Sequence, residues 1–368
     1  MTGRSLAYLC LQATTEGQAS HAHVHEIISG LRELGWHVDL FEPAYAGRAA
    51  PGVFGRLAEF RRVQRRLVRA LREGSYDALY VRGHPFAWPA ARAARRFGVP
   101  AVQECNGPYD DLYVAWPSAR LLRPVINAMA RAQYRWATAR IAVTPELAGW
   151  IERETGRAAE VIGNGANDRL FVPGATPPSG LTLPARYAVL FGALAPWQGI
   201  ETALAAAADE FWPGDVALLI VGDGALRPAV NAASSANPTR LVALGTRPYA
   251  EMPGILAGAL CSLVLSGRAG EWGLSPLKLY ESMASGVPVI VPERAGSATT
   301  VREHDSGMIV PPDDATAVAV AVAALAADPV RAAQMGRRGR AAVEAHYSWS
   351  VRARATAAVL DTVLERSV

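Results

Sequence analysis

Short apolar runs rich in β-branched residues alternate along the chain with longer stretches in which apolar positions recur at helical spacing. In the first half the strand-like runs are "SLAYLCLQA", "WHVDLFEP", "DALYVRG" and "PAVQECNG". The pattern starts again at "RYAVLFGAL" and continues through "VALLIVGDG", "RLVALGT", "CSLVLSG" and "VPVIVPE". Alternation of this kind is typical of parallel sheets covered by helices on both faces. We therefore expect an α/β protein with two Rossmann-like domains.

The boundary between these domains is marked by a segment dense in glycine and proline, "NGANDRLFVPGATPPSGLTLP". Such composition favours a crossing between domains over the interior of an element, and we place the crossing at about 163–184. We predict an N-terminal domain over 1–172, a C-terminal domain over 173–348 and a C-terminal helix over 349–368. Open α/β sheets bind ligands at the carboxyl ends of their strands, so we expect the functional loops in a cleft between the two sheets.

Composition narrows the class of protein. No apolar run approaches the roughly 20 residues that span a bilayer, and no cleavage pattern follows the first apolar run, which indicates a cytoplasmic protein. Three separated cysteines, Cys10, Cys105 and Cys261, fit core positions better than disulfides or a zinc site. Residues 1–172 carry 22 arginines against 16 acidic residues, which favours an anionic partner for the first half.

One basic residue stands apart from all the others. Lysine and arginine together number 37, and Lys278 is the sole lysine. It lies in "EWGLSPLKLYESMASGVPVIVP", in the first turn of a helix that we expect to begin near Pro276. Free backbone N–H groups at a helix start, together with the helix dipole, favour an anion there. The position of the single ammonium therefore favours an anionic ligand.

The order of motifs resembles that of the family-4 glycosyltransferases, nucleotide-sugar-dependent retaining enzymes of the two-domain GT-B fold. The resemblance runs along nearly the whole chain through segments that include "EGQASHAHVHEIISGLRELGWHVDLFEP", "VIGNGANDRLFVP", "FGALAPWQGIETALAA", "LLIVGDGALRPAV", "SPLKLYESMASGVPVIV" and "YSWSVRARATAAVLDTVL". It implies that the last segment is a helix crossing back onto the first domain. It also implies transfer of a sugar from a nucleoside diphosphate to a hydroxyl acceptor.

The resemblance assigns the ribose hydroxyls of the nucleotide to Glu281, since a carboxylate accepts two hydrogen bonds well. Family members commonly carry a second glutamate eight positions earlier, where this chain has Gly273. Glu271 is the nearest carboxylate, and we take it as a donor-sugar contact in a variant "SPLKLYE" loop.

A second departure concerns the cations that hold the diphosphate in family members. The matching loop "FGALAPWQG" has Ala193 and Gln198 at the positions of the usual basic pair. Because a leaving diphosphate needs electrostatic compensation, we hypothesise that Lys278 replaces the pair. The expected nucleotide contacts of this second domain are Gly192, Gln198, Gly222, Ser275, Pro276, Leu277, Lys278 and Glu281.

In the first domain, Gly17 lies between the first strand and a helix that Ser20 could cap, which would place backbone N–H groups at the cleft. The resemblance implies that this loop lies near the sugar and the acceptor, so Gly17 is a further expected ligand contact. His21, His23 and His25 do not share one helix face and have no carboxylate-rich partner motif, so no metal is expected.

After the fourth strand-like run, Asn106 stands where family members often carry a histidine facing the donor sugar. An amide can bond a hydroxyl but cannot act as a general base. His84 and Glu104 are candidate neighbours of the acceptor, and for both a purely structural role is equally consistent with the sequence.

Residues 56–72 form a basic amphipathic helix, with apolar residues at helical spacing and arginines around the rest. We expect the apolar stripe to pack on the first domain, and contact of the arginines with an anionic membrane stays open.

The sequence therefore predicts a retaining, metal-independent glycosyltransferase with a nucleotide-sugar donor and a hydroxyl acceptor. The alternatives are a non-catalytic sugar-nucleotide binder and a nucleotide-sugar epimerase of the same fold. A nucleic-acid partner is not expected, because no recognition motif accompanies the arginines.

Overall fold

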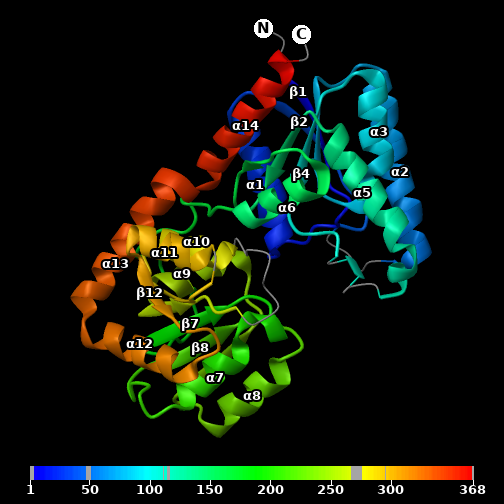
Figure 1. The fold of residues 1–368 in the computed structure, drawn as a ribbon. Helices are drawn as coiled ribbons and strands as arrows, with labels where there is room; N and C mark the ends of the chain where they lie inside the picture. Colours follow the sequence, from blue (N-terminus) through cyan, green and yellow to red (C-terminus); the bar gives the residue numbers. More distant parts are fainter. Residues whose placement is uncertain are drawn as a thin grey trace. The chain divides into compact units, whose positions relative to one another are not determined.

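The computed structural model describes residues 4–46, 51–110, 112–113, 117–266, 276–294 and 296–366. The chain forms two compact units (Figure 1). Unit 1 comprises Met1–Gly163 and Arg352–Val368, and unit 2 comprises Asn164–Val351. The division at Gly163 falls at the start of the glycine- and proline-rich crossing, nine residues ahead of the expected domain end at 172.

Unit 1 contains, among its described residues, a six-stranded parallel sheet of order β2-β1-β3-β4-β5-β6. Its strands are β1 (Ser5–Leu9), β2 (His37–Phe41), β3 (Ala78–Arg82), β4 (Ala101–Cys105), β5 (Ala139–Ala142) and β6 (Glu160–Val161). Its helices are α1 (Ala19–Glu33), α2 (Val53–Arg72), η1 (Pro85–Ala87), α3 (Trp88–Phe97), η2 (Pro117–Leu122), α5 (Arg123–Trp136) and α6 (Pro145–Thr155).

The amphipathic pattern of α2 determines how one face of this sheet is covered. Phe60, Val63, Leu67 and Leu71 of α2 are buried in one cluster with alternate strand residues of β1 and β3. Helices α2, α3 and α5 lie along the same side of the sheet, and α3 packs against both of its neighbours (Figure 1). The expected packing of the apolar stripe on the first domain is confirmed.

The start of α1 differs from the expectation. The N-cap position is Gln18, without a side-chain capping bond, and the helix begins at Ala19. A turn in which the Gln18 amide donates to the Thr15 carbonyl at 3.0 Å sets this start. Ser20 is therefore buried within the first helical turn, and the prediction that it caps the helix is wrong.

Unit 2 contains, within its described ranges, a second six-stranded parallel sheet of order β12-β11-β10-β7-β8-β9. Its strands are β7 (Tyr187–Phe191), β8 (Ala217–Val221), β9 (Leu241–Gly245), β10 (Cys261–Leu263), β11 (Val289–Pro292) and β12 (Gly307–Val310). Its helices are η3 (Pro196–Gln198), α7 (Ile200–Ala208), α8 (Arg227–Ala236), η4 (Tyr249–Glu251), α9 (Met252–Ala257), α10 (Leu277–Ala284), α11 (Ser297–His304), α12 (Ala315–Ala327), α13 (Pro329–Ala342) and η5 (Val343–Tyr347).

Alternating strand residues divide the core of unit 2 into two layers. Ala188 and Leu190 of β7 join the cluster that packs under α7 and α12. Val189 and Phe191 join the cluster that packs under α9, α10 and α11. This period of two between opposite faces is what a sheet buried on both sides requires.

The last helix, α14 (Trp349–Glu365), begins in unit 2, and from Arg352 onward it belongs to unit 1. There the Arg4 guanidinium pairs with Asp361 of α14. In the part of the chain that the structure describes, no single helix is long and apolar enough to cross a membrane, although the bent pair Ala315–Ala327 and Pro329–Tyr347 passes by length and composition.

Candidate active site

The carboxyl end of the sheet in unit 2 carries two loops in backbone contact. Gly192 follows β7, and its amide donates to the Val221 carbonyl at 2.9 Å. Gly222 follows β8 with a φ of 145°, and a Cβ placed on it would lie 1.9 Å from the Gly192 carbonyl oxygen. Only glycine fits there, because both the backbone conformation and the space exclude a side chain.

Lys278 lies directly over this glycine loop, from the first turn of α10. A Cβ on Gly192 would lie 3.4 Å from Lys278 Cδ and 3.7 Å from its Nζ. The ammonium donates a hydrogen bond to Gln198 Oε1 of η3. The structure thus brings together Gly192, Gln198 and Lys278, although 86 positions separate Gly192 from Lys278 in the sequence. Gly222, in the neighbouring loop, packs against Gly192.

The Lys278 ammonium has a neutral partner where a counterion is usual. Burial lowers the pKa of Lys278 to about 8, and the negative charge of Glu281 acts in the opposite direction. Among the described residues Lys278 forms no ion pair. A partly buried cation whose partner among the described residues is an uncharged amide is poised to bind an anion that enters the loop.

Two more of the predicted nucleotide contacts begin α10. Pro276 occupies the N-cap position, which carries no side-chain capping bond, and Leu277 is the first helical residue, with its side chain buried. Lys278 belongs to this first turn, and the free backbone N–H groups of a helix start favour an anion. Ser275 and Glu271, also predicted site residues, lie outside the described residues.

Glu281 follows one turn after Lys278 on α10 and is 4% exposed. Its Oε1 accepts a hydrogen bond from the Tyr249 hydroxyl at 2.7 Å. Tyr249 lies in η4 after β9, and sequence reasoning missed it because nothing local in "GTRPYAEM" marks it as a partner of a residue 32 positions later. The structure places a carboxylate with a fixed orientation near the carboxyl edge of the sheet.

In unit 1 the carboxyl end of β4 carries a buried carboxylate with several partners. Glu104 is 1% exposed and lies 3.0 Å from His23 Nε2 of α1. It also accepts from the Tyr80 hydroxyl and the Asn106 side-chain amide. Burial alone would raise the pKa of Glu104, but His23, Arg82 and Tyr80 outweigh it and lower the pKa to about 2. The carboxylate is therefore charged and satisfied within the protein.

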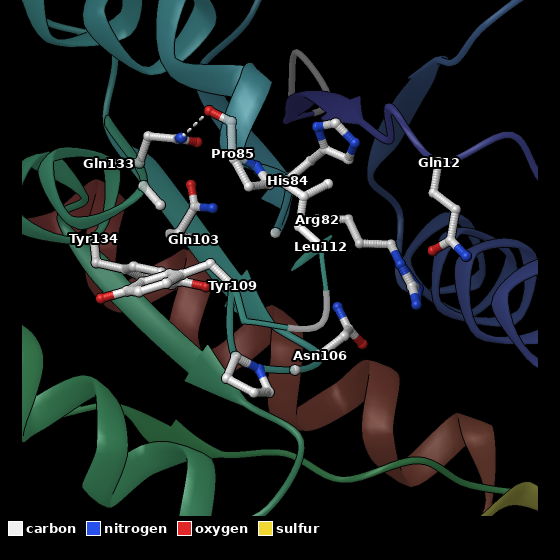
Figure 2. Close-up of a pocket in the computed structure, with 14 residues that line it drawn as sticks. Gln12, Arg82, His84, Pro85, Gln103, Asn106, Tyr109, Leu112, Gln133 and Tyr134 are labelled. Atoms are coloured by element: carbon white, nitrogen blue, oxygen red, sulfur yellow. Dashed lines mark hydrogen bonds between the residues drawn. The ribbon is translucent and has the colours of Figure 1, made fainter. Parts of the chain in front are cut away.

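His84 and Asn106 lie together at a cavity of about 400 Å³ in unit 1 (Figure 2). Burial lowers the pKa of His84 to about 4, so its ring is neutral at pH 7. Its Nδ1 accepts from the Phe86 amide at 3.3 Å, which leaves the ring proton on Nε2. Glu104 lies behind Asn106 rather than among the residues that line the cavity.

Gly17 and the three histidines of α1 lie elsewhere in unit 1. Gly17 has a φ of 84° in the loop before α1 and does not line the cavity. The rings of His21 and His25 lie 4.0 Å apart, whereas His23 pairs with Glu104. Across the described ranges, no three His, Cys, Asp or Glu side chains are grouped so that they could hold a metal ion.

Two protein-family models match the sequence of this chain. The model described as Glycosyltransferase Family 4 matches residues 20–170, and the model described as Glycosyl transferases group 1 matches residues 185–328. The first match lies within unit 1 apart from its last residues, and the second lies within unit 2.

Curated relatives are mannosyltransferases. A GDP-mannose-dependent monoacylated alpha-(1-6)-phosphatidylinositol monomannoside mannosyltransferase from Corynebacterium glutamicum is 32% identical over 140 residues, which cover 37% of this chain and 36% of the relative. A phosphatidyl-myo-inositol mannosyltransferase from Mycolicibacterium smegmatis is 27% identical over 93% of this chain and 89% of its own length. The match thus spans about a third of the first relative and most of the second.

Solved structures share the fold at low identity. A sucrose-phosphate synthase from Thermosynechococcus elongatus has a TM-score of 0.78 at 21% identity and covers 99% of this chain and 100% of that one. The Anabaena protein HepE, in complex with UDP, has a TM-score of 0.72 at 17% identity over 98% and 100% of the two chains. The solved structures show the GT-B fold. Because the two family models match in order over residues 20–170 and 185–328, the chain belongs to glycosyltransferase family 4.

Proposed function

We propose that this glycosyltransferase moves a hexosyl group from a nucleoside diphosphate sugar to a hydroxyl acceptor, with retention of configuration and without a bound metal ion. The observation that carries the proposal is the Lys278 ammonium held over the glycine loop of unit 2 by the Gln198 amide. A diphosphate in this loop would meet the ammonium, the first turn of α10 and a backbone that approaches closely at Gly192.

Glu281 supports the nucleoside half of the proposal. Its carboxylate is oriented by the Tyr249 hydroxyl, and it lies on the same helix as Lys278, three residues away. A carboxylate in this position can accept from ribose hydroxyls while the ammonium meets the phosphates. One helix then fixes both ends of the nucleoside diphosphate.

In the proposed reaction the bond between the anomeric carbon and the diphosphate oxygen breaks, and a bond to the acceptor oxygen forms on the same face of the sugar. The acceptor proton passes to the departing phosphate oxygen, so that no protein nucleophile is needed. Lys278 stabilises the negative charge that develops on the leaving group, and this electrostatic contribution is commonly the largest in group transfer. Metal independence follows if the ammonium supplies that charge.

Calorimetric titration with GDP, UDP, ADP and dTDP tests the site. GDP is the first choice, because the curated relatives named above include a GDP-mannose-dependent enzyme. We expect one nucleotide to bind wild type and Lys278→Ala to bind it roughly 10- to 100-fold more weakly, as loss of a charged hydrogen bond predicts. Arg331→Ala, at an exposed residue of α13, is the matched control and should bind normally.

Retention of configuration and independence from a metal ion are tested by separate experiments. Proton NMR of the first-formed product from an α-linked donor should show the α-anomer, and EDTA should leave turnover unchanged. A β-linked product would contradict retention, and loss of turnover with EDTA that Mg²⁺ restores would contradict metal independence. Absence of binding by all four nucleotides would remove the donor site itself.

We further propose peripheral contact of unit 1 with an anionic membrane through α2, since curated relatives are named for phosphatidylinositol-based acceptors. The apolar stripe of α2 is buried in the core, but its arginines are exposed, and at its N-terminus Phe54 is 88% exposed. The exposed arginines are Arg61, Arg62, Arg65, Arg66, Arg69 and Arg72. A charged helix tipped with an aromatic residue suits the interface of an anionic bilayer.

Co-sedimentation with vesicles tests this contact. Vesicles with 30% phosphatidylglycerol should retain wild type at low salt, pure phosphatidylcholine vesicles should not, and the triple change Phe54→Ser, Arg61→Ser, Arg65→Ser should reduce binding several-fold. Arg95→Ser, Arg96→Ser on α3 serves as a basic control. No binding of wild type to anionic vesicles would discard the contact.

A further inference from the structure

Residues 167–171 form a turn near the start of unit 2, which we call the entry turn. The Asn167 side chain sets the turn, because its Oδ1 accepts from the backbone amides of Arg169 at 3.1 Å and Leu170 at 3.0 Å. The Phe171 amide donates to the Asn167 carbonyl at 2.8 Å. Phe171 is fully buried in the core layer of unit 2 that includes α9 and α10, so the turn ends with an aromatic ring in that layer.

Arg340 of α13 joins the entry turn to α10, the helix that carries Glu281. Its Nη1 donates to the carbonyls of Phe171 at 2.7 Å and Ala284 at 2.9 Å, and its Nη2 donates to the Asp168 carbonyl at 3.0 Å. Ala284 is the last residue of α10, where carbonyl groups lack helical partners and a cation is favourable. One guanidinium therefore fixes the backbone of the entry turn relative to α10.

The Phe171 ring contacts the side chain that orients Glu281. The ring centroids of Phe171 and Tyr249 lie 5.4 Å apart at an interplanar angle of 69°, which is an edge-to-face contact. Tyr249 belongs to η4, and its hydroxyl donates to Glu281 Oε1 at 2.7 Å. Direct contacts therefore lead from the entry turn through Tyr249 to the carboxylate, and all of them lie within unit 2.

We propose that the entry turn is part of the donor site, with Phe171 holding the Tyr249 ring so that its hydroxyl fixes the Glu281 carboxylate for the ribose hydroxyls. Phe171 and Tyr249 are then positioning residues, since both act on the ribose through Glu281. This inference rests on the proposed function, which assigns the ribose to Glu281. A binding group that is already oriented in the free protein loses less conformational freedom when the ligand arrives.

The proposal orders the effects of the two side chains. Tyr249→Phe removes only a hydroxyl group, so the ring keeps its packing while the Glu281 carboxylate loses the donor that orients it. Phe171 acts on Glu281 through that same hydroxyl. Once the hydroxyl is absent, a change at Phe171 should have no further effect on the ribose, and the two changes should not be additive.

Calorimetry with paired nucleotides measures the contribution of the ribose hydroxyls. The probes are GDP and 2′,3′-dideoxy-GDP, or the same pair for whichever base binds wild type. Wild type should prefer the ribonucleotide by about 10-fold or more. Glu281→Ala should remove this preference, Tyr249→Phe should reduce it by roughly 5-fold, and Phe171→Leu should reduce it by roughly 3-fold. Inorganic pyrophosphate should bind all of these variants as it binds wild type, because Lys278 is unchanged.

The double variant Phe171→Leu, Tyr249→Phe should show the same preference as Tyr249→Phe alone. Trp212→Phe is the matched control, because Trp212 is also a buried aromatic residue but belongs to the other core layer of unit 2. This control should lower the melting temperature and keep the full preference for the ribonucleotide. Circular dichroism melting shows that each variant is folded, and Phe171→Met, which keeps more of the side-chain volume, replaces Phe171→Leu if that variant is unfolded.

The inference is overturned if folded Tyr249→Phe or the folded Phe171 variant keeps the wild-type preference, or if the two effects add in the double variant. A parallel loss of pyrophosphate binding would also overturn it, since the two residues would then support the whole site rather than the ribose contact.

Failure of the proposed function looks different. Wild type that binds none of the nucleotides would remove the donor site, and the inference with it. Wild type that binds GDP and its dideoxy analogue equally would overturn the ribose assignment of Glu281 and the inference, but would leave the phosphate contact of Lys278. A ribose preference in wild type that the variants keep would overturn the inference alone.

Discussion

The carboxyl ends of the two sheets treat a buried charge in opposite ways. In unit 1 the Glu104 carboxylate is surrounded by His23, Tyr80 and Asn106, and its pKa falls to about 2. In unit 2 the hydrogen-bond partner of the Lys278 ammonium among the described residues is the Gln198 amide, and the pKa of Lys278 falls to about 8. Both pKa values decrease, but for a carboxylate this marks stabilisation of the charged form and for an ammonium it marks destabilisation.

The difference separates a structural charge from a charge that awaits a ligand. Removing one partner of a buried ion pair leaves the other uncompensated, which is strongly destabilising. A partly buried cation that forms no ion pair with any described residue is destabilised by desolvation in the free protein, and an arriving anion offsets that cost. Glu104 should therefore matter chiefly for the stability of unit 1, and Lys278 chiefly for ligand binding.

The largest expected effect is that of Glu104→Ala on unit 1. We expect a loss of roughly 3–5 kcal/mol in the free energy of unfolding, because His23 and the Tyr80 hydroxyl would lose their shared partner in the core. Hydrogen exchange of the β4 amides reports unit 1 by itself. Glu152→Ala, at an exposed position of α6, should change it little. A loss below about 1 kcal/mol would remove the distinction between the two charges.

Next in size is Gly222→Ala in unit 2. A Cβ there would lie 1.9 Å from the Gly192 carbonyl, and φ is 145°, so overpacking and backbone strain add to roughly 2–4 kcal/mol. Exchange of the β7 and β8 amides measures the loss. Gly214→Ala, where nothing lies within 4 Å, is the matched control. Equal exchange in the two variants would show that the two loops do not depend on each other.

The sequence predicted the sheets and the place of Lys278, but not the hydrogen-bond partners of the two buried carboxylates. The alternation of apolar runs predicted both parallel sheets, because each strand and helix buries its own periodic face. Lys278 could be assigned to the Gly192 loop because the family resemblance expects a basic pair in that loop, the pair is absent, and Lys278 is the sole lysine. The hydrogen bonds of Tyr249 to Glu281 and of Tyr80 to Glu104 could not be predicted, because they depend on the register of the strands and the path of the loops.

The cap of α1 and the burial of Arg82 Nη1 were missed for related reasons. Ser20 fits the preference for an N-cap residue, but the turn that ends at Gln18 starts the helix earlier. In an arginine-rich chain nothing local distinguishes Arg82 from the exposed arginines of α2. Its Nη1 is buried and has no hydrogen-bond partner among the described residues, which is visible only in the structure.

The smallest effect is the acid dependence of unit 1. The pKa of Glu104 lies near 2 when folded, against an ordinary value of 4.5. A carboxyl whose pKa is lower in the folded protein than in the unfolded chain stabilises the fold at pH values above the unfolded pKa. This stabilisation is lost as the pH falls from about 4.5 toward 2. Exchange of the β4 amides at pH 5, 4 and 3 should therefore show progressive loss in wild type and a flatter profile in Glu104→Ala. Parallel profiles would contradict the charge assignment.

The central claim, that Lys278 is a destabilised cation waiting for a diphosphate, has a direct readout because no other lysine is present. Reductive methylation with ¹³C-formaldehyde labels Lys278 and the α-amine alone, so that NMR follows its titration without mutation. We predict a midpoint near pH 8 in the free protein that rises to roughly 9 or above when the favoured nucleoside diphosphate is bound. A midpoint near 10.5 that no nucleoside diphosphate changes would contradict the account.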